Sequence, residues 1–154
     1  MTVFRIAQKQ YIDDLSGTGA YLYGGRWNLK GTRVPYTASS MSLAYLEFLV
    51  HQFERDSWPQ NMWVSEIEIK APDSIIELVQ EELPPTWKDI KYHGETQQIT
   101  QKYFSQDIIG IKVPSVIAPR EFNVLLNPSY KKFQSDVNIQ FKEPLELDKR
   151  FGIH

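Results

Sequence analysis

Alternating apolar and polar residues recur in short stretches of this chain, and a period of two predicts β-strands. The clearest stretch runs from Trp63 to Lys70 and places Trp63, Ser65, Ile67 and Ile69 on its inward face. Shorter strands are predicted at Val3–Ile6, Gly25–Asn28, Arg33–Thr37, Ile75–Leu78, Ile108–Val113, Val116–Ala118, Glu121–Leu126 and Val137–Phe141. Strands of this length and number predict a sheet-based fold.

Glycine, proline and asparagine mark the connections between these stretches. Leu29–Thr32 and Asn127–Pro128 are expected to be turns, and Asp13–Gly17 a helical turn that ends at its glycine. Pro35 lacks a backbone donor, which favours an edge position for the strand Arg33–Thr37, or one where an amide need not pair. The glycines concentrated between residues 17 and 25 predict a bent hairpin arm or a close approach of a ligand to the backbone.

Two longer stretches predict helices. Met41–Phe53 follows Ser39 and Ser40, either of which can cap a helix. Its expected apolar stripe consists of Leu43, Leu46, Val50 and Phe53. The second helix, His93–Phe104, is less amphipathic. Because the two helices do not alternate regularly with strands, the pattern predicts a single α+β domain over residues 1–154, with mixed short-stranded sheets and two main helices.

One charged side chain interrupts the apolar part of the first helix. Glu47 lies beside the stripe, one turn after Leu43 and Ala44. A carboxylate in such surroundings is costly unless it is paired or borders a cavity. Two interpretations stay open: a structural ion pair with Arg26, or one wall of a ligand pocket.

Charge and composition exclude several classes of function. The chain has 154 residues and a net charge of −2, so direct nucleic-acid binding is not expected. With no cysteine and three scattered histidines, no metal site is expected. The first ten residues lack an apolar signal core, and no stretch reaches the roughly 20 apolar residues of a membrane span. The sequence therefore predicts a soluble cytoplasmic protein away from membranes, and leaves the oligomeric state open, a homo-oligomer included.

The remaining candidate chemistry consists of Arg26, Tyr36 and Glu47. Arginine offers a permanently charged fork for phosphate, and tyrosine a stacking face with a hydroxyl. A preorganised carboxylate can bind ribose hydroxyls and stabilise a developing cation. Cleavage of the nicotinamide–ribose bond of NAD needs little more, because nicotinamide leaves as a neutral ring and requires no proton. These residue types are common, so they suggest this chemistry without selecting it.

Two runs of residues resemble the signatures of a known family. GGRWNLKGTRVPYTASSMSLAYLEFLVH is similar to the N-terminal signature of the RES domain, and VPSVIAPREFNVLLNP resembles its second signature. The resemblance implies a fold similar to that of ADP-ribosyltransferases. It also implies a toxin of an Xre–RES toxin–antitoxin pair that degrades NAD, in some members by phosphorolysis. The implied partner is an Xre-type helix-turn-helix antitoxin, which blocks the active site and carries the DNA binding.

The resemblance also assigns site residues. Arg26, Tyr36, Glu47 and Ser115 match the arginine, tyrosine, glutamate and serine of the family and are the expected catalytic residues. The residues expected to bind NAD are Gly25, Arg26, Trp27, Asn28, Tyr36 and Asn123. Tyr130 departs from the family pattern, which commonly has histidine there, and this puts the acceptor side of the pocket in question.

The resulting hypothesis is an NAD-degrading toxin with water or phosphate as acceptor and no metal. Arg26 is expected to grip phosphate, Tyr36 to stack on the nicotinamide end, and Glu47 to orient the ribose and stabilise the cation. Two alternatives remain, transfer of ADP-ribose to a protein target and a non-enzymatic interaction module. Structural roles are also open for several residues: core packing for Trp27, satisfaction of a turn for Ser115, and support of a strand end for Asn123.

Overall fold

A computed structural model describes residues 1–53 and 58–151 of the chain. The strands form one seven-stranded sheet in the order β4-β5-β6-β2-β1-β3-β7, in which only β4 and β5 pair in parallel. The strands are β1 (Thr2–Gln8), β2 (Tyr36–Ala38), β3 (Met62–Ile69), β4 (Ile75–Glu77), β5 (Gly110–Pro114), β6 (Phe122–Leu126) and β7 (Val137–Pro144). The helices are α1 (Thr18–Tyr23), α2 (Met41–Phe53), α3 (Gly94–Gln97), α4 (Ile99–Phe104) and α5 (Phe133–Asp136). The predicted α+β class is confirmed.

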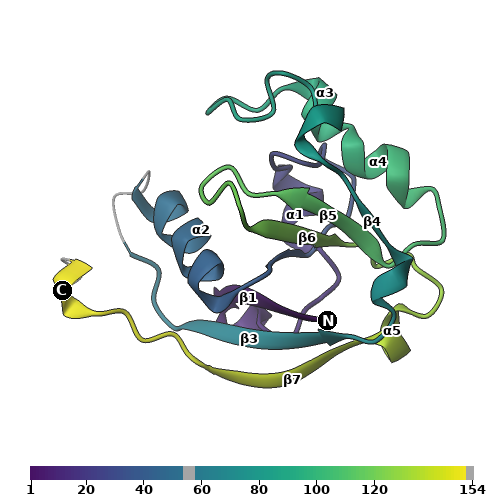
Figure 1. Ribbon diagram of the computed structural model, residues 1–154. Helices are drawn as coiled ribbons and strands as arrows, with labels where there is room; N and C mark the ends of the chain where they lie inside the picture. Colours follow the sequence, from purple (N-terminus) through teal and green to yellow (C-terminus); the bar gives the residue numbers. More distant parts are fainter. Residues whose placement is uncertain (54–57, 152–154) are drawn as a thin grey trace.

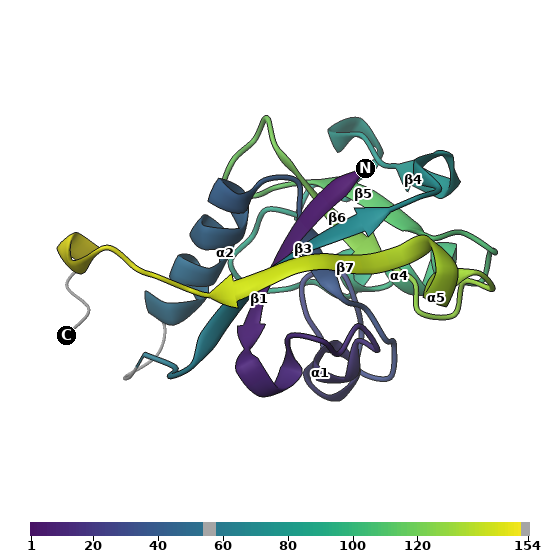
Figure 2. The same cartoon turned by 90° about the horizontal axis from the view of Figure 1, so that it is seen from below.

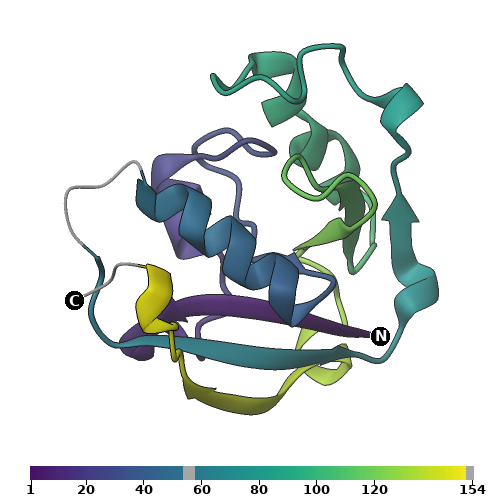
Figure 3. The same ribbon diagram turned by 60° about the vertical axis from the view of Figure 1, so that its left-hand side comes forward.

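The helix α2 lies on one face of the sheet, between β1 and the β5–β6 pair (Figures 1 and 3). Leu43 and Ala44 pack there on Ala38 of β2, with Phe4 and Ile6 of β1 at the margin. The same face continues into a larger cluster that surrounds Trp27, Trp87 and Leu125. The opposite face is covered by a third apolar cluster that includes Val3, Ile67 and Val137. Each face of the sheet therefore has its own core.

The start of α2 is fixed by the predicted serine cap. The amide of Leu43 donates to Ser40 Oγ at 3.0 Å, which satisfies one of the free donors at a helix start. The Ser40 hydroxyl in turn donates to the carboxylate of Glu121, just before β6. This chain of contacts ties α2 to the β5–β6 connection.

The predicted apolar stripe of α2 is only partly correct. Leu43 is buried, but Leu46 and Val50 are each 41% exposed, whereas Ala44, Phe48 and Leu49 are buried. The side chain of Phe53 lies outside the described residues. Because most of this helix is apolar, the period alone does not select which side meets the sheet.

Several predicted strands are wrong. Gly25–Asn28 and Val116–Ala118 are irregular segments, and β2 lies inside the sheet between β1 and β6 rather than at an edge. The alternative position expected for Pro35, one where an amide need not pair, is confirmed because Pro35 precedes β2. Its carbonyl accepts from the amide of Leu126 at 3.0 Å. The helical turn expected at Asp13–Gly17 lies earlier, at Lys9–Tyr11.

The ends of the sheet match the sequence prediction more closely. The chain from Trp63 to Ile69 forms β3, and Val137–Phe141 falls within β7 at the sheet edge. Figure 2 shows β7 crossing the underside of the molecule and the chain continuing from it past α2. The predicted second helix is divided into α3 and α4 at Gln98. No helix among residues 1–53 and 58–151 has the length and apolarity to cross a bilayer.

Candidate functional site

Glu47 lies half-buried on α2 and is held through one of its two oxygens. Asn123 Nδ2 donates to Glu47 Oε1 at 2.8 Å, and Ser115 Oγ donates to the same oxygen at 3.2 Å. Within the part of the chain that the structure describes, no hydrogen bond reaches Glu47 Oε2. The carboxylate is therefore oriented by the protein and keeps one oxygen for another partner.

The sheet brings these three side chains together. Asn123 on β6 lies opposite Ala38 of β2 and Val113 of β5, so it points to the face that carries α2. Ser115 follows the end of β5, and its amide donates to the carbonyl of Glu121 at 3.0 Å, closing the β5–β6 connection. This connection meets α2 twice, at the Ser40–Glu121 contact and again at Ser115 and Glu47.

Ser115 uses its whole hydroxyl for structure. Its Oγ accepts hydrogen bonds from the amides of Ile117 and Ala118, each at 3.1 Å, and donates a hydrogen bond to Glu47. These contacts occupy the donor and both acceptor positions of a hydroxyl. The side chain is also fully buried. The geometry therefore supports a positioning role for Ser115 in place of direct participation in catalysis.

Replacing Ser115 with Ala is expected to weaken turnover of a substrate bound at Glu47 by about 10-fold, the effect of losing a contact of roughly 1.4 kcal/mol to a charged group. Asn123 continues to hold Glu47 Oε1 in this variant, so the loss stays well below that expected for removing the carboxylate. The initial rate of nicotinamide release from NAD, the reaction expected from the sequence, measures it. A loss as complete as that caused by replacing Glu47 with Gln, which removes the negative charge, would show that Ser115 takes part in the chemistry itself.

Arg26 lies in the connection between α1 and β2 and is held by a distant segment. Its Nη1 donates to the carbonyls of Trp87 and Asp89, both at 2.7 Å, and its Cζ lies 5.0 Å from the centroid of the Tyr92 ring. None of the ion pairs formed within the described ranges joins Arg26 to Glu47. The structural Arg26–Glu47 pair left open by the sequence is therefore not formed.

Tyr36 of β2 holds the glycine-rich connection through two hydrogen bonds of its hydroxyl. Its hydroxyl donates to Asn28 Oδ1 at 2.7 Å and accepts from the amide of Trp27 at 3.1 Å. Burial raises the pKa of the Tyr36 hydroxyl above its ordinary value, so the phenol is neutral at physiological pH. A Cβ at Gly25 would lie 2.7 Å from this hydroxyl oxygen, which explains why glycine is needed there.

Trp27 and Asn28 have structural roles that differ from the expected ligand contacts. Trp27 is only 3% exposed, and its ring centroid lies 5.9 Å from that of Trp87. Asn28 is fully buried, and its Nδ2 contacts the carbonyls of Ala20, Leu29 and Thr32. Neither side chain is free to contact a ligand, so both hold the connection that carries Arg26.

The connection that carries Arg26 and the Glu47 carboxylate lie on the same face of the sheet. Tyr36 and Ala38 are two residues apart on β2, so their side chains share a face and lie about 7 Å apart along the strand. Tyr36 contacts the Arg26 connection, and Asn123, which holds Glu47, lies opposite Ala38. The fold thus places the Arg26 connection and the Glu47 carboxylate on one face of the sheet without pairing the two charged groups.

Two pockets on the surface lie away from Arg26 and Glu47. One of about 430 Å³ is lined by Leu78, Leu83 and Ile99, and one of about 260 Å³ by Phe48 and Trp58, among other residues. Neither is lined by Arg26 or Glu47. The pocket expected between these two groups therefore stays a prediction.

Comparison with known proteins assigns the chain to a family. The model of the RES domain matches residues 2–148. The chain belongs to the RES domain family. Among its relatives, Toxin Res of Yersinia enterocolitica is 40% identical over 138 residues, which cover 88% of this chain and 89% of the relative. Toxin Res of Photorhabdus laumondii is 36% identical over 153 residues, which cover 97% of this chain and 96% of the relative.

Two further proteins match the chain, one by sequence and one by fold. The Prs ADP-ribosylating toxin of a Sphingobium species is 39% identical over 123 residues, covering 77% of this chain and 74% of that protein. The crystal structure of the MbcT–MbcA toxin–antitoxin complex of M. tuberculosis contains a chain that matches with a TM-score of 0.73. That match covers 94% of this chain and 83% of the other at 16% identity, which shows a shared fold.

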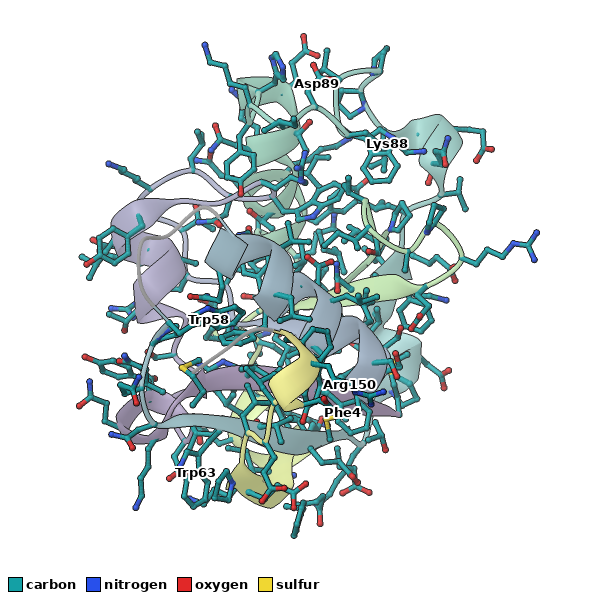
Figure 4. All side chains as sticks on the ribbon, turned by 90° about the vertical axis from the view of Figure 1, so that its left-hand side faces the viewer. Phe4, Trp58, Trp63, Lys88, Asp89 and Arg150 are labelled. Atoms are coloured by element: carbon teal, nitrogen blue, oxygen red, sulfur yellow. The ribbon has the colours of Figure 1, made fainter. Side chains whose placement is uncertain are left out.

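The sequence did not indicate which residues support Arg26 in this RES domain. Trp87 and Asp89 lie 61 and 63 residues away along the chain, and Gln97 Nε2 donates to the carbonyl of Gly25 at 2.9 Å from a similar separation. Figure 4 shows Lys88 and Asp89 together at the end of the molecule above α2. Trp87 and Asp89 contact Arg26 through their backbone carbonyls, and backbone groups carry no sequence signal.

Tyr130 lies away from the candidate site. It packs against the apolar cluster on the sheet face opposite α2, and its hydroxyl donates to Asp136 Oδ2 at 3.2 Å. The carboxylate of Asp136 adds to burial in raising the pKa of the Tyr130 hydroxyl. The difference from the family histidine therefore does not alter the surroundings of Glu47, contrary to the concern raised by the sequence.

Proposed function

We propose that this RES domain is the toxin of a toxin–antitoxin pair and cleaves the nicotinamide–ribose bond of NAD. The observation that carries the proposal is the geometry of Glu47, which is oriented through Oε1 while Oε2 accepts no hydrogen bond from residues 1–53 and 58–151. The names of the relatives in Yersinia and Photorhabdus support a toxin. The name of the Sphingobium relative supports chemistry on an ADP-ribosyl group.

The proposed reaction places the ribose of the nicotinamide end against Glu47. The C–N bond breaks with its electron pair moving to the nicotinamide nitrogen, which turns a cationic ring into a neutral leaving group. The ribose then carries positive charge in an oxocarbenium-like transition state. Glu47 Oε2 stabilises that charge, and because Ser115 and Asn123 already orient the carboxylate, little reorganisation is needed.

The diphosphate of NAD is assigned to the Arg26 connection. A guanidinium is suited to phosphate because its N–H groups form a planar fork. Tyr36 is half-buried, contacts the Arg26 connection and lies on the same face of the sheet as Ala38 and the Glu47 carboxylate. The acceptor is water or phosphate. Water yields ADP-ribose and releases a proton, whereas phosphate yields a phosphorylated ADP-ribose.

Purified protein incubated with NAD tests the proposal. Nicotinamide is expected in the medium, and parallel reactions with and without inorganic phosphate identify the acceptor. A rate that depends on phosphate, with a phosphorylated product, indicates phosphorolysis, and equal rates indicate hydrolysis. A complete absence of nicotinamide in both would rule out NAD cleavage and favour a non-enzymatic module.

Transfer of ADP-ribose to a protein is the second candidate, favoured by the name of the Sphingobium relative. NAD labelled in its adenine ring distinguishes the two. Label bound to protein after incubation with a cell extract indicates transfer, and label in small products indicates degradation.

An antitoxin is the proposed partner, supported by the toxin–antitoxin complex in which the structural relative was solved. The resemblance to Xre–RES pairs makes a helix-turn-helix protein the expected type. Co-expression of the neighbouring reading frame is expected to restore the growth of cells that produce this protein.

A further inference from the structure

The segment from Trp87 to His93 meets Arg26 with two backbone carbonyls and one aromatic ring. The carbonyls of Trp87 and Asp89 accept from Arg26 Nη1, and the ring of Tyr92 lies 5.0 Å from the guanidinium carbon. This distance is within the range of a cation–π contact. The segment therefore fixes both the position of one nitrogen and one side of the guanidinium group.

These contacts leave a defined part of Arg26 for a ligand. A guanidinium has five N–H groups in one plane. Those on Nη1 are used, whereas Nη2 and Nε make no hydrogen bond to any residue in the described ranges. Together Nη2 and Nε form a fork that can bind two oxygens of one phosphate. The half-buried arginine thus presents an oriented, unfilled anion-binding edge.

The segment is anchored on both sides of Tyr92. On one side, the Trp87 ring is buried against Trp27. On the other, His93 Nε2 lies 2.9 Å from Asp89 Oδ2, and Gln97 of α3 holds the carbonyl of Gly25. Tyr92 itself is 40% exposed, so its ring lies at the surface with one side toward Arg26.

We propose that Tyr92 is a positioning residue that orients Arg26 for the diphosphate of a dinucleotide. The inference rests on the proposed NAD chemistry and assigns the diphosphate to the Nη2–Nε edge of Arg26. Tyr92 acts through Arg26 and takes no part in breaking the nicotinamide–ribose bond. Its loss therefore weakens the binding of NAD and leaves the chemical step at Glu47 unchanged.

Tyr92→Ala and Tyr92→Leu test this assignment, since leucine keeps apolar bulk but lacks the aromatic face. Both are expected to raise the KM for NAD about fivefold with little change in kcat, the size of effect expected from losing a cation–π contact. Tyr92→Phe keeps the ring and is expected to restore the wild-type KM. Ile90→Ala is the matched control, because Ile90 lies in the same segment and is 89% exposed.

Titration of each variant with ADP, followed by calorimetry, separates this inference from the proposed function. ADP carries the diphosphate but no nicotinamide, so its binding does not depend on turnover. Weaker ADP binding in Tyr92→Ala and Tyr92→Leu than in Tyr92→Phe and Ile90→Ala supports the assignment, even if the wild-type protein releases no nicotinamide. Equal ADP affinity in all four variants overturns it, as does an unchanged KM in an active enzyme. An equal loss in Ile90→Ala also overturns it, because it would show a general disturbance of the segment.

Discussion

Replacing Glu47 with Gln is expected to reduce NAD turnover by about 10²–10³-fold, in line with the loss of a preorganised electrostatic group. Glutamine has the shape of glutamate, and its amide oxygen can still accept from Asn123 and Ser115 in the place of Oε1. The amide nitrogen then occupies the place of Oε2. A group that stabilised a cation is thereby replaced by a neutral donor facing the ribose.

The measurement is the single-turnover rate of nicotinamide release, with the thermal unfolding midpoint recorded for the same samples. Glu66→Gln is the matched control, because Glu66 is a half-buried carboxylate on β3 that has no part in the proposed site. It is expected to keep wild-type turnover. Wild-type turnover in Glu47→Gln would reject Glu47 as the group that stabilises the cation, and a large drop in its unfolding midpoint would show a structural role.

The helix that carries Glu47 could be predicted from the sequence because its signals are local. Ser40 caps α2, and the helix spans Met41–Phe53 as expected. Its buried side could not be predicted in the same way. Most of its positions are apolar, so the helix period does not decide between Leu46 and Phe48. Phe48 is buried and its ring centroid lies 6.1 Å from that of Trp58, a contact made across the fold and not within the helix.

The glycine-rich region shows the opposite case, in which a local signal is ambiguous. Gly17 and Gly24 have φ angles of 70° and 71° and flank α1 at its two ends. The same residues were compatible with the bends of a hairpin, because glycine adopts positive φ in both settings. The two settings, a short helix and a hairpin bend, are distinguished by the packing of the connection around Asn28 and Tyr36. That packing consists of contacts between residues about eight positions apart, which the local glycine pattern does not predict.

The site residues also divide into those that the sequence could indicate and those that depend on long-range contacts. Glu47, Ser115 and Asn123 could be proposed from the family resemblance, and the structure brings all three into contact. The support of Arg26 by Asp89 and Tyr92 could not be proposed, because it joins backbone carbonyls and one ring across more than 60 residues. Long-range contacts of this kind follow from the topology of the sheet and leave no periodic pattern in the sequence.

Asn28→Asp is expected to lower the free energy of unfolding by about 3–5 kcal/mol at neutral pH, the range for a buried charge that is not paired with an opposite charge. Asn28 Nδ2 faces the carbonyls of Ala20, Leu29 and Thr32 at 2.9, 3.0 and 3.2 Å. A carboxylate oxygen in its place meets acceptors instead of donating to them, at a fully buried position.

The pH dependence of this variant follows from the same environment. Burial against carbonyls raises the pKa of the new carboxyl in the folded state above its unfolded value of about 3.9. The charge penalty is therefore absent below the unfolded pKa, appears as the pH rises above it, and is complete once the pH exceeds the folded pKa. The deficit relative to wild type should be smaller at acidic pH than at neutral pH.

Urea unfolding followed by tryptophan fluorescence measures this deficit, since Trp27 and Trp87 are buried next to the same connection. Asn138→Asp is the matched control, because Asn138 lies on the edge strand β7 and donates one hydrogen bond, to the carbonyl of Ser135. Its effect should stay within about 1 kcal/mol, the net value of one hydrogen bond. Equal losses in the two variants would show that the buried amide of Asn28 does not stabilise the connection, and Arg26 would then need another source of order.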